Sequence, residues 1–191
     1  MGLFKRLPPR AELPSAITAA LELAKGEWVL AFGVDDNTGA YVVATTYGLS
    51  VVSLASATSH VSLSVTGTPT AARTLWRRWL SVDAGAWEPE TATLTVTWAE
   101  GGRGAQWSFL DQQTLLPETL RERVQASVVL ATRLTLGDRR SGRVAIRQDF
   151  ATRELISQTI LGRYTRADDP EVQAHVQAAL AHLRDQVGLP T

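Results

Sequence analysis

The stretch RWLSVDAGAWEPETATLTVTW (residues 78–98) decides the fold. In its second half, threonine alternates with Leu94, Val96 and Trp98, and a period of two is typical of a β-strand with one buried face. The Glu-Pro-Glu segment at 88–90 predicts a turn before this strand. We therefore expect the middle of the chain to form an antiparallel sheet.

Tryptophans are concentrated around this sheet. Gly85 lies between Trp79 and Trp87 and is expected to bulge or bend its strand. The indole side chains either fill the sheet core or form an aromatic ligand platform; the set consists of Trp79, Trp87, Trp98 and Trp107. We favour the core, because each would bury roughly 150–250 Å².

Strand patterns also flank this region. EWVLAFGV (27–34) and AYVVATT (40–46) enclose the turn-rich DDNTG and predict a hairpin, and GLSVVSL (48–54) predicts a third strand. HVSLSV (60–65) is either an extra hairpin or a mobile insertion within a Ser/Thr-rich segment, 53–72, whose role is open. AQWSFL (105–110) predicts the strand that follows the GGRG turn.

Helical periodicity appears at three places. Ser15 is the expected N-cap of a short helix that stops by Gly26, and Pro117 opens an amphipathic helix that ends near Leu130. Asp169 is the expected N-cap of the terminal helix. Its apolar stripe consists of Val172, Val176, Ala179, Leu180, Leu183 and Val187.

GRVAIRQDF (142–150) and ELISQTILGRY (154–164) predict one more pair of strands before that helix. Sequential hairpins with few helices predict an α+β fold. We expect a basic tail at 1–14 and a β-domain with its helix at 15–131. A hairpin plus helix at 132–191 is expected to pack on the same domain.

Four stretches carry a family resemblance: YVVATTYGLSVV, WLSVDAGAWEPETATLTV, LPETLRERVQASVVLA and DPEVQAHVQAALAHLRDQVG. The chain resembles a family of uncharacterised actinobacterial proteins whose first part is similar to pleckstrin-homology-like (PH-like) domains. The resemblance implies a seven-stranded, half-open antiparallel barrel capped by the helix that begins at Pro117. It implies no activity.

Composition excludes several classes of function. The chain has 19 basic and 19 acidic residues, so no net charge attracts nucleic acid. It has no cysteine, which excludes disulfides and thiol chemistry. No apolar run is long enough for a membrane span, and no signal peptide pattern is present. We expect a cytoplasmic protein without cofactor or metal.

Basic residues supply the candidate binding surface. Lys5, Arg6 and Arg10 lie in the tail, and Arg77 and Arg78 lie in the LWRRW segment. Together they are expected to make weak contact with an anionic membrane.

Arg73, Arg77, Arg78 and Arg103 are also candidates for a phosphate site, but Asp35 and Asp36 occupy the loop in which PH-like folds usually bind phosphate. That loop also fails the register of a calcium site.

No catalytic set is evident. Ser59 and His60 are merely adjacent, His175 and His182 are seven residues apart, and Glu88 and Glu90 flank an exposed proline turn. The leading hypothesis is a non-catalytic interaction module that presents a strand edge or its terminal helix to a protein partner or a second copy. The alternatives are a peripheral membrane protein that binds through its basic tail, and an enzyme with an unrecognised site.

Overall fold

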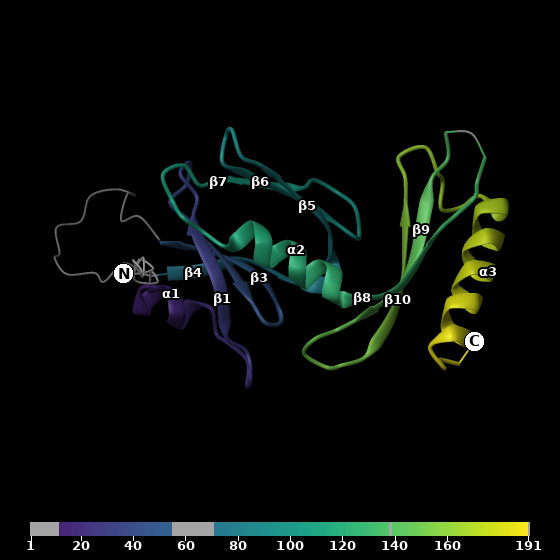
Figure 1. Ribbon diagram of the computed structural model, residues 1–191, viewed down its shortest axis with the longest axis horizontal. Helices are drawn as coiled ribbons and strands as arrows, with labels where there is room; N and C mark the ends of the chain where they lie inside the picture. Colours follow the sequence, from purple (N-terminus) through teal and green to yellow (C-terminus); the bar gives the residue numbers. More distant parts are fainter. Residues whose placement is uncertain (1–11, 55–70, 138, 191) are drawn as a thin grey trace, which may run out of the picture.

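The computed structural model describes residues 12–54, 71–137 and 139–190. They form an α+β structure with three antiparallel sheets and a C-terminal helix (Figure 1). Within these ranges, none of the sheets closes on itself and no strand is shared between two sheets. None of the helices in the described residues is long and apolar enough to cross a membrane.

The first sheet is a meander of four strands: β1 (Val29–Val34), β2 (Tyr41–Thr45), β3 (Gly48–Leu54) and β4 (Ala71–Arg78). The DDNTG turn joins β1 to β2, so the predicted hairpin and third strand are confirmed. The HVSLSV segment lies outside the described residues.

The second sheet is a meander of three strands: β5 (Val82–Glu88), β6 (Thr93–Trp98) and β7 (Ala105–Ser108). A short 3-10 turn, η1 (Trp79–Ser81), leads into it. Leu94 and Val96 are buried, whereas the β6 threonines are half-buried or exposed, so the predicted one-sided strand is confirmed.

Gly85 has a different role from the one expected. The register shift in this strand lies between Val82 and Ala84, whereas Gly85 faces helix α2 (Leu116–Ser127). A Cβ atom at Gly85 would overlap Cδ2 of Leu120. The missing side chain therefore lets α2 approach the sheet closely.

The main core lies between the first two sheets and α2. It combines buried residues of β2, β3 and β6 with Trp79, Trp107, Phe109, Leu116 and Leu120. Helix α2 was expected to continue to Leu130, but it ends at Ser127. The β-branched pair that follows opens strand β8 (Val128–Arg133) instead.

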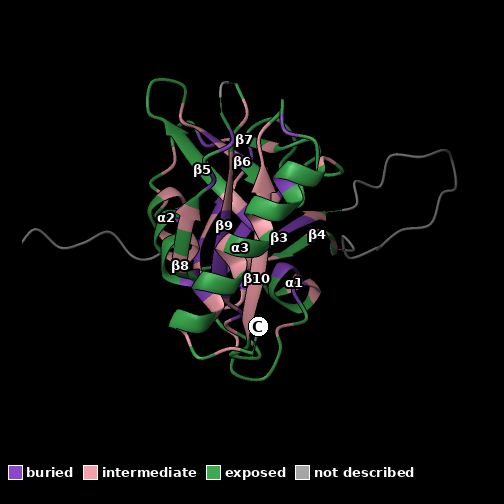
Figure 2. Ribbon diagram, turned by 90° about the vertical axis from the view of Figure 1, so that its right-hand side faces the viewer, coloured by how far each residue is buried: buried purple, intermediate pink, exposed green. Residues whose placement is uncertain are grey.

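The third sheet has the order β8–β9–β10, with β9 at Gly142–Gln148 and β10 at Leu155–Leu161. The expected C-terminal hairpin is therefore part of a three-stranded sheet, and residue 131 lies inside β8. Helix α3 (Pro170–Gln186) covers one face of this sheet (Figure 2). The predicted cap is confirmed, because the Asp169 side chain accepts a hydrogen bond from the Glu171 N–H at 2.9 Å.

The predicted stripe of α3 packs against the third sheet, in a core formed by Val144, Ile146, Val172 and Leu183 with their neighbours. The stripe is therefore not available to a partner. At the other end of the chain, helix α1 (Ser15–Ala20) packs on the first sheet. Its N-cap is Pro14 rather than Ser15, and no side chain caps it.

Candidate functional site

The two predicted surface arginines of β4 have different partners. Arg78 Nη1 lies 2.5 Å from Oδ2 of Asp149, a carboxylate buried in the β9–β10 turn. The Arg77 guanidinium stacks over the Trp98 ring, 5.7 Å from its centroid, and stays exposed. The remaining predicted surface residues, Lys5, Arg6 and Arg10, lie outside the described residues.

The phosphate site considered from sequence does not assemble around Arg73. Its Nη1 donates to the backbone oxygen of Leu21 at 2.6 Å, and its Nη2 lies 3.3 Å from Oε2 of Glu22. Arg73 therefore fastens α1 to β4, and with Arg78 held by Asp149, two of the four candidate cations serve the fold.

The DDNTG turn is held by its own aspartates. Asp35 is only 2% exposed, and its carboxylate accepts hydrogen bonds from the Thr38 N–H, the Thr38 hydroxyl and the Ser108 N–H. Asp36 accepts from the Leu110 N–H at 2.6 Å. Both aspartates therefore tie the β1–β2 turn to the end of β7.

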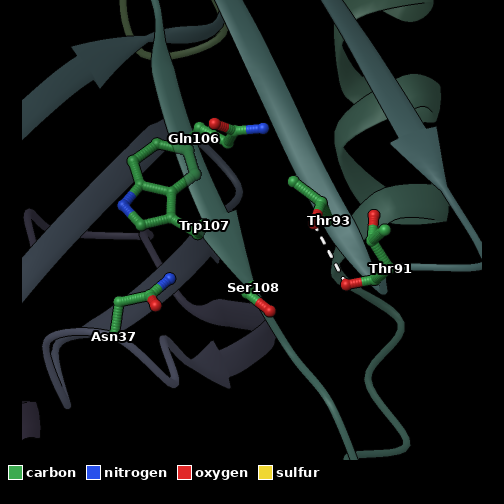
Figure 3. Close-up of a pocket in the computed structure, with 6 residues that line it drawn as sticks. All are labelled: Asn37, Thr91, Thr93, Gln106, Trp107 and Ser108. Atoms are coloured by element: carbon green, nitrogen blue, oxygen red, sulfur yellow. Dashed lines mark hydrogen bonds between the residues drawn. The ribbon is translucent and has the colours of Figure 1, made fainter.

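A depression of about 310 Å³ lies beside this turn, along β7 (Figure 3). Its lining is uncharged and consists of Asn37, Thr91, Thr93, Gln106, Trp107 and Ser108. Trp107 is buried and is also part of the main core. These side chains offer hydrogen bonds but no acidic or basic group.

Some of the tryptophan side chains lie in the core and others lie at the surface. Trp79 and Trp107 are buried as predicted, and Trp98 is half-buried. The core position expected for Trp87 is wrong, because its side chain is 37% exposed at the end of β5, where it stacks on Phe109. Only the first two rings, with part of Trp98, support the core interpretation.

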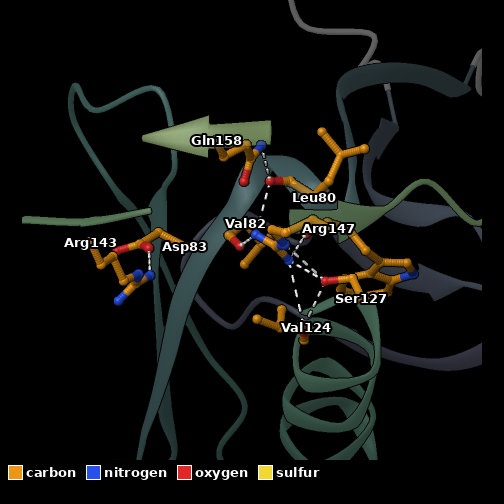
Figure 4. Close-up of polar contacts among 9 residues, drawn as sticks. Leu80, Val82, Asp83, Val124, Ser127, Arg143, Arg147 and Gln158 are labelled. Atoms are coloured by element: carbon orange, nitrogen blue, oxygen red, sulfur yellow. Dashed lines mark hydrogen bonds and ion pairs between the residues drawn. The ribbon is translucent and has the colours of Figure 1, made fainter. Parts of the chain in front are cut away.

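Arg147 of β9 forms the most highly connected polar site in the part of the chain that the structure describes (Figure 4). It is 2% exposed. Its Nη1 donates to the carbonyl oxygens of Leu80 and Val82 at 2.9 and 2.8 Å, and its Nη2 donates to that of Trp79 at 2.8 Å. Its Nε donates to the Ser127 hydroxyl at 3.0 Å.

Arg147 therefore joins three elements: η1, the start of β5 and the C-terminal end of α2. The carbonyl oxygens at a helix C-terminus carry partial negative charge, which favours a cation there. Burial, and after it the charge of nearby Arg143, lowers the pKa of Arg147 to about 10, whereas Asp83 and Glu100 oppose the shift. Backbone dipoles, rather than a bonded carboxylate, hold this cation.

Further polar contacts surround Arg147. Arg143 forms an ion pair with Asp83 of β5, and Gln158 Nε2 of β10 donates to the Leu80 carbonyl oxygen at 2.8 Å. Sequence reasoning missed this site. The available signal was GRVAIRQ, in which Arg143 and Arg147 alternate with Val144 and Ile146 and so share one face of β9.

In the described ranges, no group of three or more His, Asp or Glu residues could hold a metal ion. The ring of His175 contacts the backbone oxygen of Glu171 on its own helix, and His182 contacts Gln186. Glu88 and Glu90 are exposed as expected. Ser59 and His60 lie outside these ranges.

Comparisons of the chain with protein-family models, with curated proteins and with solved structures find no match.

Proposed function

We propose that the chain is a non-catalytic interaction module of PH-like architecture whose ligand is a segment of a protein partner. The order of elements supports the architecture. A four-stranded meander is followed by a three-stranded meander and then by α2, which packs on the core between them. This is the order that the family resemblance implies.

The observation that carries the proposal is an open strand edge. Side chains of the chain itself occupy part of two other edges. At the edge of β1, the Gln112 amide bonds both the N–H and the carbonyl oxygen of Val34, and at the edge of β7, the Asp35 carboxylate accepts the Ser108 N–H. The open edge is that of β8 in the third sheet, where Val128 and Val129 are 39% and 42% exposed. An exposed strand edge can bind an extended segment of another protein through main-chain hydrogen bonds.

The test is the capture of tagged full-length chain from a native lysate, with soluble and membrane fractions assayed separately, followed by reconstitution with each purified candidate. A single protein that binds the purified chain stoichiometrically supports the proposal. Recovery with anionic membranes that salt releases, and that Arg77→Glu weakens, would favour the membrane alternative. Turnover of ester, phosphate or nucleotide substrates by the purified chain would contradict the proposal.

A further inference from the structure

We propose that β8 binds an extended peptide segment whose acidic N-terminal residues precede alternating apolar residues, and that Arg133 pairs with the acidic end. This inference rests on the proposed function and specifies its site and its partner chemistry. It is carried by three observations on β8: unpaired backbone groups, apolar exposure and an uncompensated charge.

The unpaired backbone groups follow from the register. The N–H of Leu134, directly after β8, donates to the Gly142 carbonyl oxygen of β9 at 2.9 Å, so these two residues occupy a hydrogen-bonded position of the ladder. Hydrogen-bonded pairs alternate with non-bonded pairs in an antiparallel ladder. The N–H and C=O groups of Ala131 and Arg133 therefore point away from β9, and no residue in the described ranges bonds them.

The side chains along this edge are suited to an extended apolar segment. Val128 and Val129 are exposed, and Ala131 is exposed as well. In Figure 2, β8 lies at one margin of the third sheet. Val129 occupies the irregular position between the two paired segments of β8, so regular backbone pairing is expected around Ala131 and Arg133.

Charge identifies the acidic end of the partner. Arg133 lies directly opposite Arg143, and like charges in this position repel. Asp83 compensates Arg143, whereas Arg133 is exposed and forms no ion pair with any residue that the structure describes. A carboxylate opposite Arg133 would relieve the repulsion. Arg133 is the last residue of β8, so the residue opposite it in an antiparallel partner lies at the N-terminal end of the partner segment.

A second copy of the chain fits this edge less well. Residues 128–133 read VVLATR and contain no acidic side chain, so pairing β8 with its own copy brings further arginine to the edge and no carboxylate. An acidic partner peptide is therefore the occupant that the charges favour.

The probe is a synthetic fluorescent peptide with two N-terminal glutamates followed by three valine–threonine repeats. A matched control carries lysines in place of the glutamates. We expect the glutamate peptide to raise the anisotropy on binding the full-length chain, to bind about tenfold more tightly than the lysine control, and to be weakened by salt. Its binding should slow amide hydrogen exchange at Ala131 and Arg133.

Two variants locate the site. Ala131→Pro removes an outward N–H that the β8–β9 ladder does not use, and it should weaken binding about tenfold, whereas Ala131→Thr keeps that N–H and should bind like the parent chain. Arg133→Glu should invert the preference between the two peptides. Urea unfolding of each variant checks that the fold is intact.

Equal binding of both peptides, no binding, or retained binding by Ala131→Pro would overturn the inference. So would concentration-dependent dimerisation that Ala131→Pro abolishes. A native partner that still binds Ala131→Pro and Arg133→Glu would leave the proposed function standing while removing β8 as its site.

Discussion

Arg147→Met is expected to destabilise the fold by about 3–5 kcal/mol. Methionine retains the apolar volume of the side chain, but it removes the hydrogen bonds that Arg147 donates to the carbonyl oxygens of Trp79, Leu80 and Val82, although the Leu80 oxygen keeps Gln158 as a donor. At about 1 kcal/mol for each lost hydrogen bond, the three together contribute about 3 kcal/mol. Loss of the hydrogen bond from Arg147 Nε to the Ser127 hydroxyl adds to this sum.

Urea unfolding followed by tryptophan fluorescence measures the change, because Trp79 lies in the main core. The matched control is Arg163→Met, which removes an exposed arginine whose contact is a stacking over Tyr164, and which should cost under about 0.5 kcal/mol. A loss below about 1 kcal/mol for Arg147→Met, with an unchanged m-value, would refute the account of Arg147 as a backbone clamp.

The pH dependence of this clamp has a defined sign. Its folded pKa of about 10 lies below the usual pKa of an arginine, so burial of the charge is an unfavourable contribution. That contribution is constant while both states are protonated, and it diminishes only as the pH rises through 10. The stability difference between the parent chain and Arg147→Met should therefore be flat between about pH 6 and about pH 9.

Three further substitutions test the packing and the turns, each by urea or thermal unfolding. Gly85→Ala should cost about 1–3 kcal/mol because its Cβ overlaps Leu120, and less in a Leu120→Ala background; equal costs in both backgrounds would disprove that contact. Asp35→Ala should cost about 2–3 kcal/mol through loss of its buried hydrogen bonds, and a neutral result would mean that the turn is held by other contacts. Asp169→Ala should cost about 1 kcal/mol through loss of the α3 cap, whereas exposed Asp168→Ala should change stability little; similar effects would argue against capping.

The strands were predictable because their signal is local. Alternation in β6 and the turn at 35–39 each follow from residues adjacent in sequence, and so does the cap at Asp169. The start of β8 was missed because Val128 continues the helical spacing of Leu120 and Val124. Pairing with β9, a long-range contact, decides in favour of the strand.

The site needed information that no single segment contains. Arg147 is bonded by backbone oxygens of η1 and β5, so no charge pattern in the sequence identifies its partners. Asp35 is recognisable as a turn residue, but its burial depends on Ser108, 73 positions later. Trp87 shares the inner face with Leu94, yet it remains exposed because it lies at the end of its strand.

The junction of α2 and β8 fixes the spacing of the two halves of the chain, because Ser127 and Val128 follow one another without a connecting loop. Insertion of one residue there would turn the helix by about 100° relative to the strand, or would reverse the two faces of β8. The first change would rotate Leu120 away from Gly85, and the second would exchange Leu130 with its exposed neighbours. Related sequences should therefore carry no insertion or deletion at this junction, even where their surface turns differ in length.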